Sequence, residues 1–585
     1  MLSLSTPAAA DTFIRWNQAG YAPGHPVRLV IMSEADLSGE IWTLQLEDGD
    51  ESEGRIGPST VGRGPHTPLP FNHEVDFLSG FSKKGSHLFS VAGESAAIQV
   101  LDQPYRELLT EPLVHLRMMR SGPNTVPPRR PSHPGDARAH VWIPDGDPDK
   151  GRWKPDPLGR TVDVEGGWYD AGDQLKFTLN ISYTVFHLLL ANELQGVRPL
   201  LMYDSGSYIK SGLTPSIDLE SYIKSGLAPL LEEAKHGLDW LMKVHPADDL
   251  FVIQVGNEDD HNQPLRLPED DLLDGKRPAL CALSRVHLNS AAAALAMGAI
   301  TWEKLGLPDQ ASVYGDEAVR LFQRAQQSDT VLTAFERAKT NDFYHDDSLE
   351  DQLALAGVTL HRWTGDPAYL EIAIAAAPPA SAEPSWKSWH WSANYALSAF
   401  DPSAAARLRE EADRYLENAE QHGRPWGIPG RYVWGALHRW IEMTIATELA
   451  EKVRPRRSGR FLSMNEDSYI KSGLTPLMLD YIFGRNNWGV SFLFSERLPN
   501  TVRNIYSPAY GFLGIFPTGA LSEGPGNARS HREFMRYFEI ADNDPFHRFN
   551  TAEGVFFDNS TDFMCQESTI NGQADILLLL TLASR

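Results

Sequence analysis

The segment Gly166–Phe177, GGWYDAGDQLKF, holds two carboxylates at a spacing suited to chemistry. Asp170 and Asp173 stand three positions apart, and Gly172 between them permits a tight backbone. Such a pair can position one water molecule, with one carboxylate taking its proton and the other fixing its orientation. The same aspartates could instead cap a helix or line a calcium loop. The spacing alone leaves these interpretations open.

The composition favours a neutral ligand. The 585 residues carry a formal net charge of −24, which argues against nucleic acid, anionic membranes and polyanionic substrates. A neutral polymer is not repelled, and 15 Trp, 18 Tyr and 25 Phe offer faces on which sugar rings can stack. No apolar run reaches the roughly 18 residues that a membrane span needs. Cys281 and Cys565 are too few for a disulfide framework, and we expect two buried thiols, with a single bridge as the alternative.

The chain divides into two regions with different sequence patterns. Between residues 12 and 103, short β-rich runs such as Val27–Met32 alternate with Gly- and Pro-rich stretches, which predicts a small β-sandwich. From 105 to 585 apolar residues recur at helical spacing and strand signals are sparse. One helical face is Leu231, Ala234, Leu238 and Leu241. The sequence therefore predicts a two-domain protein, all-β at 12–103 and all-helical at 105–585.

One nonapeptide is repeated at irregular spacing. SYIKSGLTP occurs at Ser207–Pro215 and Ser468–Pro476, and Ser221–Pro229 differs from it only at Ala228. The irregular spacing excludes a solenoid. We interpret the copies as a repeated DNA element inserted in frame into tolerant surface loops. A sugar-contacting loop built around its Tyr and Lys is the functional alternative.

A series of motifs resembles glycoside hydrolase family 9, which contains many endoglucanases. GGWYDAGD at Gly166–Asp173 resembles the signature of that family, and Asn17–Pro23 (NQAGYAP) resembles the start of an immunoglobulin-like module that precedes many of its catalytic domains. Further matching stretches are Leu231–Lys243, Gln254–Gly256, Asp260–His261, Pro268–Glu269, Tyr432–Gly435, Leu479–Asn487 and Gly519–Pro525. The similarity covers nearly the whole chain. It implies an immunoglobulin-like sandwich at 12–103 followed by an (α/α)6 barrel at 105–585.

The resemblance also implies the catalytic groups. The family's general acid falls on Glu567, where Phe563 and Met564 could raise the carboxyl pKa and keep it protonated. Asp173, supported by Asp170, would activate water on the opposite face of the sugar. This is inverting hydrolysis of β-1,4-glucosidic bonds in cellulose or related β-glucans, and it needs carboxyl groups about 6.5–9.5 Å apart. The alternative for Glu567 is a helix-capping carboxylate.

The residues expected to grip the sugar chain depart from the family pattern in places. The expected substrate-binding residues are Trp168, Tyr169, His261, Trp434, Arg503 and Tyr506. Gln174 stands where the family usually has a histidine, Tyr506 replaces another, and Pro264 stands near the place of a stacking tryptophan. The residues aligned with the family's acid and base are not among these departures. Crystalline cellulose, mixed-linkage glucan, short oligosaccharides and amino sugars all remain candidate substrates.

No cofactor is expected for the chemistry, although one segment could hold a structural calcium ion. The family's calcium site aligns with Asp346–Gln352, so that Asp347 and Asp351 would be ligands; a solvated acidic surface is the alternative. Pro7–Asp11 resembles the end of a signal peptide without its basic and apolar regions, and we expect a secreted or periplasmic protein. We also expect a monomer that acts on a β-glucan polysaccharide or oligosaccharide, with no nucleic-acid or membrane partner.

Two other functions are compatible with these residues. An exo-acting glycosidase on β-linked gluco- or glucosamino-oligosaccharides would differ from an endo-acting enzyme in its product lengths. A catalytically weak carbohydrate-binding protein would keep the fold and lose the chemistry. Retention of Asp170, Asp173 and Glu567 together speaks against the second. The chain has neither a GxSxG elbow nor a P-loop, so acyl and phosphoryl transfer have little support.

Overall fold

A computed structural model gives the three-dimensional structure of the chain. It describes residues 11–146, 152–195, 229–271, 273, 276–329, 344, 349–380, 383–386, 388–454, 473–536 and 544–584. The first two copies of the repeated nonapeptide lie outside the described residues, apart from Pro229, which begins a helix. Of the third copy only Gly473–Pro476 is described, and Leu474 begins a helix there.

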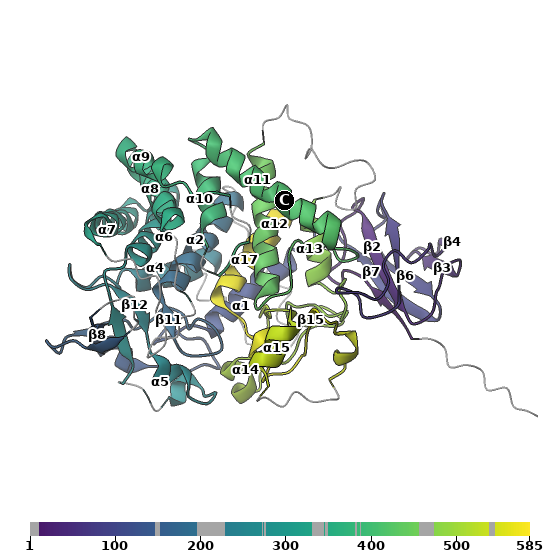
Figure 1. Ribbon diagram of the computed structural model, residues 1–585, viewed down its shortest axis with the longest axis horizontal. Coiled ribbons are helices and arrows are strands. Elements are labelled where there is room, and N and C mark those ends of the chain that lie inside the picture. Colours follow the sequence, from purple (N-terminus) through teal and green to yellow (C-terminus); the bar gives the residue numbers. More distant parts are fainter. Residues whose placement is uncertain are drawn as a thin grey trace, which may run out of the picture.

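The N-terminal domain consists of two antiparallel sheets, as predicted for an immunoglobulin-like sandwich (Figure 1, purple). The first sheet has the order β1-β2-β5 and the second the order β4-β3-β6-β7. The strands are β1 (Thr12–Arg15), β2 (Val27–Ser33), β3 (Ile41–Gln45), β4 (Glu51–Arg55), β5 (Phe71–Phe77), β6 (Gly85–Val91) and β7 (Glu94–Val100). Side chains in β6 and β7 alternate between buried and exposed, which is the pattern of a sheet with one face on the core. Every residue of β2 is buried.

Six helices of the second domain contact one another in a closed ring, which is the inner layer of an (α/α)6 barrel (Figure 1). In order around the ring they are α2 (Thr178–Gln195), α6 (Arg285–Lys304), α8 (Glu350–Thr364), α10 (His390–Leu397), α12 (Ala436–Lys452) and α17 (Ile570–Ala583). Packed on both sides, these helices carry apolar residues around most of their circumference. The segment of α6 from Val286 to Trp302 is buried without interruption.

The outer layer consists of helices that each contact an inner helix, namely α1 (Glu111–Met118), α4 (Pro229–Leu241), α7 (Pro308–Gln327), α9 (Pro367–Ala375), α11 (Pro402–His422) and α13 (Leu474–Ile482). Three of them, α4, α7 and α11, are clearly amphipathic. In α7, Ala311, Tyr314 and Ala318 recur on the buried side, while the other face is exposed. The helix that the sequence places over Leu231–Lys243 is α4. No helix among the described residues is long and apolar enough to cross a bilayer.

The helical domain also contains strands, which the sequence did not predict. The larger sheet has the order β10-β8-β13-β12-β11, with β9 paired to β8. Its strands are β8 (Ala139–Pro144), β9 (Trp153–Pro155), β10 (Thr161–Val162), β11 (Lys176–Phe177), β12 (Val252–Val255) and β13 (Pro278–Cys281); β14 (Gly526–Asn527) pairs with β15 (Gly554–Val555). Segments of two to six residues are too short for alternation to identify them.

These strands and several short helices lie in the long connections between the barrel helices. The short helices are α5 (Glu258–His261), α14 (Pro508–Leu513), α15 (Ala528–Phe534) and α16 (Phe563–Gln566). In Figure 1, α5, α14 and α15 lie at the lower end of the barrel, below the ends of the long helices. This end of the barrel therefore carries most of the irregular backbone from which a site can be built.

The two domains share a packed interface. Arg15 donates from Nε to the carbonyl oxygen of Asn487 over 3.1 Å, and Asn17 donates to the Asp480 carboxylate over 3.1 Å. Val30 and Met32 of β2 belong to the same apolar cluster as the barrel core. The exact boundaries at 12–103 and 105–585 remain a prediction.

Candidate active site

A cavity of about 450 Å³ contains all three carboxyl groups that the sequence singled out. Asp170 and Asp173 come from the segment before β11, and Glu567 from the segment between α16 and α17. The other lining residues are Ala171, Gly172, Gln174, His261, Gln263, Pro264, Leu265, Arg266, Tyr344, Trp386, Trp434, Tyr506, Pro508, Glu523, Phe534, Phe563 and Thr569. The closed ring of inner helices brings the two ends of the domain together at this point.

The Asp170 carboxylate is held inside the protein. Its Oδ1 accepts a hydrogen bond from Asn180 of α2 and its Oδ2 accepts one from the Tyr344 hydroxyl, each over 2.5 Å. Burial, followed by the charge of Asp173, raises the pKa of Asp170 to about 7. The backbone N–H of Ile570, at the start of α17, donates to the Asp170 carbonyl oxygen over 3.0 Å. Asp170 therefore ties the segment to two barrel helices instead of capping either one.

The Asp173 carboxylate faces the cavity and is oriented from two sides. Its Oδ1 accepts a 3.0 Å hydrogen bond from the backbone N–H of Leu175, and its Oδ2 lies 2.8 Å from Nδ1 of His261. Burial works to lower the pKa of His261, but its hydrogen bond to Asp173 and the charge of that group outweigh it, so the pKa is raised. A protonated His261 donates to Asp173 and leaves the remaining carboxylate lone pairs for a water molecule.

Glu567 lies on the other segment and has the character of a proton donor. Its Oε1 accepts a 3.0 Å hydrogen bond from the backbone N–H of Gly172. Burial and then the Asp173 charge raise its pKa well above the ordinary value, and the Gly172 hydrogen bond opposes the shift only in part. The helix-capping alternative does not hold, because α17 is capped by Thr569, whose side chain accepts from Gly572. A carboxyl group protonated at mild pH can serve as a general acid.

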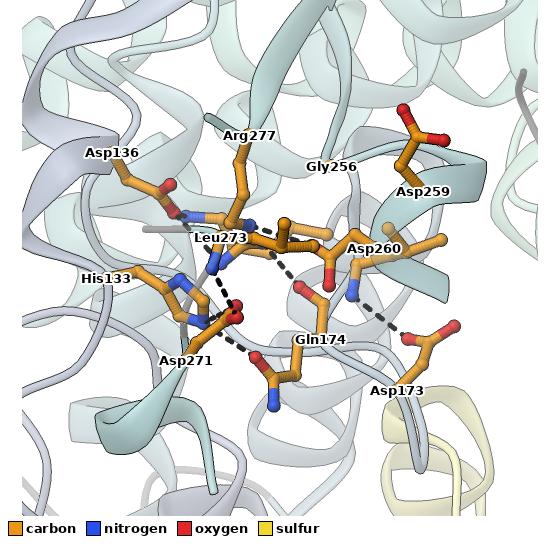
Figure 2. A network of polar contacts seen from close by, with 12 residues as sticks. His133, Asp136, Asp173, Gln174, Gly256, Asp259, Asp260, Asp271, Leu273 and Arg277 are labelled. Carbon is orange, nitrogen blue, oxygen red and sulfur yellow. Dashed lines mark hydrogen bonds and ion pairs between the residues drawn. The ribbon is translucent and has the colours of Figure 1, made fainter. Parts of the chain in front are cut away.

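A buried network of charges holds the loop that carries these groups (Figure 2). The guanidinium of Arg277 lies 2.9 Å from Asp260 and 3.7 Å from Asp136, and it donates to the carbonyl oxygen of Gln174. Oε1 of Gln174 lies 2.8 Å from Nε2 of His133, which fixes the position next to Asp173. Asp260 and His261 lie together in α5. The network therefore positions both Asp173 and the histidine that orients it.

The structure places the six expected substrate-binding residues in two groups. His261, Trp434 and Tyr506 line the cavity. Trp168 and Tyr169 do not, which corrects the sequence expectation. Trp168 is fully buried beside Gly237, where an added Cβ would lie 2.4 Å from its ring, and Tyr169 is 2% exposed.

Arg503 also lies outside the cavity lining. Its backbone N–H donates to the Asp558 carboxylate over 3.0 Å, which anchors the segment there. Aromatic residues in the signature segment thus support the barrel, whereas those on the connecting loops face the ligand space.

Several cavity residues were missed by the sequence analysis. Tyr344, Trp386 and Phe534 lie in segments without a recognisable pattern, and their places depend on how the loops fold over the barrel. Glu523 is different, because it lies within the GALSEGP stretch at Gly519–Pro525 that the resemblance had already marked. The glutamate in that motif was the sequence signal that could have identified Glu523 as a cavity residue.

The candidate calcium ligands find no support. Asp347 lies outside the described residues. The Asp351 carboxylate is buried at the start of α8, where its two oxygens accept from the backbone N–H groups of Gln352, over 3.1 Å, and of Trp389, over 2.7 Å. These bonds tie α8 to the segment before α10, and the calcium site stays a prediction. Cys281 and Cys565 are free and buried, as predicted.

The fold is a two-layer helical barrel, and its candidate site brings Asp170, Asp173 and Glu567 to one cavity. Residues 105–580 match the model of glycosyl hydrolase family 9. The match covers most of the chain, and the chain belongs to this family. The family's chemistry requires no cofactor.

Similar proteins agree with this assignment. A xyloglucan-specific endo-beta-1,4-glucanase from Bacteroides ovatus is 23% identical over 84% of this chain and 81% of its own length. Endoglucanase 24 from Oryza sativa subsp. japonica is 28% identical over 42% of each chain. The chain spans 42%, 57% and 44% of three curated endoglucanases that it matches, which is about half their length.

Solved structures show the same fold over nearly the whole chain. A metagenome-derived glycoside hydrolase family 9 endoglucanase superposes with a TM-score of 0.74 at 20% identity, covering 98% of this chain and 99% of that one. An endoglucanase from Alicyclobacillus acidocaldarius superposes with a TM-score of 0.73 at 20% identity and the same coverage. The β-domain is included in both alignments, because they extend beyond the residues of the barrel.

Proposed function

We propose that the protein is an inverting endo-β-1,4-glucanase, with Glu567 as general acid and Asp173 as general base. One observation carries the proposal: a carboxyl group with a strongly raised pKa and a second carboxylate oriented by a histidine line the same cavity. Inverting glycosidases use this division of roles. The names of the similar proteins, which are endoglucanases, support the β-1,4-glucan substrate.

In the proposed reaction, Glu567 protonates the glycosidic oxygen as the bond to the anomeric carbon breaks. A water molecule, deprotonated by Asp173, attacks that carbon from the opposite face of the ring. His261 stabilises the Asp173 carboxylate before the transfer and holds its orientation. Asp170 lies in the cavity wall, but both of its carboxylate oxygens are bonded to the protein, to Asn180 and Tyr344, and it acts as a positioning residue for the loop. The aromatic rings of Trp434 and Tyr506 offer apolar faces to the sugar.

Reducing-end release from barley β-glucan, carboxymethylcellulose and cello-oligosaccharides tests the proposal. We expect wild-type protein to release short oligosaccharides from internal positions of the polymers. The Glu567→Gln variant should lose about 10²- to 10⁴-fold in rate, the usual contribution of a general acid. Single-sugar products from the first time point would favour the exo-acting alternative. Saturable binding without turnover would favour the carbohydrate-binding alternative.

We propose two further properties of the protein along with this function. A polymeric substrate cannot enter a cell, so we propose that the enzyme acts outside the cytoplasm; fractionation of cells that express the natural gene tests this. We also propose that it acts as a monomer. Light scattering coupled to size-exclusion chromatography would detect a larger species.

A further inference from the structure

A histidine, an aspartate and a cysteine meet beside the cavity without lining it. His531 lies in α15, Asp562 caps the start of α16, and Cys565 lies within α16. One ligand atom of each, a ring nitrogen, a carboxylate oxygen and a sulfur, lie within 4.8 Å of one another. His531 is 5% exposed, and the other two side chains are completely buried. None of the three has a part in the proposed chemistry.

The contacts within this trio leave each ligand atom directed at the others. Nε2 of His531 lies 2.8 Å from Oδ2 of Asp562, whereas Oδ1 of Asp562 accepts from the backbone N–H of Cys565 over 3.2 Å. The helix cap therefore uses one carboxylate oxygen and leaves the second on the side of the histidine. Sγ of Cys565 lies 3.6 Å from the carbonyl oxygen of Val555, in β15. β15 contacts α15, and both lie at the lower end of the barrel in Figure 1.

These atoms approach the arrangement of a tetrahedral zinc site. With Zn–S and Zn–O bonds of usual length, a sulfur and an oxygen ligand stand about 3.6 Å apart, which matches the distance from Cys565 to Val555. A nitrogen and an oxygen ligand stand about 3.4 Å apart, so the bonded pair of His531 and Asp562 must open by about 0.6 Å. A small rotation of either side chain supplies this movement. The Val555 carbonyl oxygen is then placed as the fourth ligand.

The charges of the trio also suit a divalent ion. Binding would exchange the thiol proton of Cys565, released to solvent, for the metal. The thiolate and the Asp562 carboxylate then carry two negative charges, which a doubly charged cation cancels inside a buried site. Thiolate and imidazole ligands favour Zn²⁺, whereas Ca²⁺ and Mg²⁺ prefer sites made of oxygen atoms alone.

A second trio of possible ligands, in the barrel core, is complete without a metal. It consists of His438, Glu442 and Asp575. Burial works to lower the pKa of His438, but Glu442, which lies 2.9 Å away, and Asp575, at 3.2 Å, outweigh it and raise that pKa to about 9. A protonated imidazole between two carboxylates already forms an ion triad. This trio also lacks a sulfur ligand.

We infer that His531, Asp562 and Cys565 bind a structural Zn²⁺ ion, with the carbonyl oxygen of Val555 completing a tetrahedral site. The site has three side-chain ligands of three chemical types, drawn from two helices more than 30 positions apart in the sequence. The inference does not rest on the proposed function, because no step of the hydrolysis passes through the ion.

The ion would fasten one wall of the cavity. Phe534 of α15 and Phe563 of α16 both line the cavity, and each packs on Trp434, with ring centroids 5.5 and 5.4 Å apart. A metal bond between the two helices fixes the spacing of these rings. It also fixes the end of α16, which leads directly into Glu567.

Cobalt can replace zinc in such a site and report its ligands. A thiolate bound to Co²⁺ absorbs in the near ultraviolet, and tetrahedral Co²⁺ absorbs strongly in the visible. The full chain is produced without an affinity tag in medium that supplies either Zn²⁺ or Co²⁺, so that the ion can enter as the chain folds. Inductively coupled plasma mass spectrometry measures the metal content. We expect about one Zn²⁺ per chain, and both absorption bands from the cobalt protein.

Three variants assign the ligands. Cys565→Ala should lose the thiolate band, and His531→Gln should retain about 10-fold less metal after dialysis against a chelator. Cys281→Ala, which removes the other buried thiol, is the matched control and should behave as wild type. If Cys565→Ala does not fold, retention of the band in Cys281→Ala still assigns it to Cys565, because the chain has only two cysteines.

Three results would overturn the inference. The first is wild-type protein that holds neither Zn²⁺ in proportion to the chain nor Co²⁺ with a thiolate band. The second is bound Co²⁺ without that band, which places the ion at other residues. The third is a thiolate band that survives in Cys565→Ala. None of these readouts depends on hydrolysis, so a failure here leaves the proposed function intact, and an inactive enzyme leaves this test unaffected.

Discussion

The backbone N–H of Gly172 donates a 3.0 Å hydrogen bond to Oε1 of Glu567, across 395 positions of sequence. This bond fixes the proposed acid against the loop whose next residue is the proposed base, Asp173. The separation of acid and base is thus set by one backbone contact and not by long side chains alone. Small changes in this loop should therefore have large effects on rate.

Replacing Gly172 with alanine tests this contact. A Cβ atom there would lie 2.2 Å from Cδ1 of Tyr506 and 2.9 Å from its carbonyl oxygen, so the loop or the tyrosine must move. We expect kcat to fall about 10-fold or more, and the free energy of unfolding to fall by about 1–3 kcal/mol, as for other overpacked sites. The control is Gly511→Ala, where nothing lies within 4 Å of the added atom. Equal kcat values for the two variants would contradict the account.

The pH dependence of hydrolysis should follow the proton on Glu567. Burial and the Asp173 charge raise the pKa of this group well above 4.5, so the acid stays protonated toward neutral pH. Activity should persist above pH 5 and decline as pH rises through the raised pKa, since the deprotonated group cannot donate. A kcat/KM profile on cellotetraose measures this limb. A profile that already declines between pH 4 and 5 would show that the acid is not shifted.

Part of this site could be predicted because some of its residues lie close together in the sequence. Helical periodicity predicted a helical domain, whereas the resemblance to family 9 implied the (α/α)6 barrel and the pairing of the Asp170–Asp173 segment with Glu567. The sequence did not show that Asp170 is buried against Asn180 whereas Asp173 faces the cavity. This difference depends on contacts with α2 and Tyr344. Trp168 was misassigned for the same reason: an aromatic residue beside a catalytic motif has the same sequence pattern whether it packs inward or outward.

His261 should affect turnover more than binding. It lies 2.8 Å from Asp173 and orients the proposed base, so removal should lower kcat by about 10-fold or more and change KM little. Steady-state kinetics of His261→Gln on cellotetraose measures the two constants. His25→Gln, at an exposed position in the β-domain, serves as the control. A rise in KM at constant kcat would instead make His261 a substrate-binding residue only.

Asp170 should make stability depend on pH. Its pKa is raised from 3.8 to about 7 in the folded protein, chiefly by burial, so the folded state holds a proton that the unfolded chain releases at lower pH. The stability present below pH 4 is therefore lost as pH rises toward 7.

Asp170→Asn removes this titration. Between pH 4 and 7, the variant should lose less stability than wild type, by on the order of 2 kcal/mol. Denaturant unfolding at a series of pH values measures the difference. The exposed Asp259→Asn variant should follow wild type. If Asp170→Asn follows wild type as well, the carboxyl group is ionised in the folded protein.

The glucan-cleaving chemistry and the identity of the sugar are separable questions. The motifs around the proposed acid and base can be recognised in the sequence, although the solved structures with this fold are only 20% identical to the chain. Fold and reaction class could therefore be predicted from the sequence. The electrostatic character of the cavity could not, because it requires knowing how deeply each carboxyl group is buried and which donors it meets.

The stereochemistry of the first product tests the central claim most directly. Proton NMR of the anomeric signals, recorded during hydrolysis of cellohexaose, distinguishes α- from β-configured reducing ends before mutarotation mixes them. The account predicts that wild type releases the α-anomer first and that Glu567→Gln releases about 10²-fold less product in the same time. Initial release of the β-anomer would contradict it, because that outcome requires a covalent intermediate on one of the carboxylates in place of a water molecule activated by Asp173.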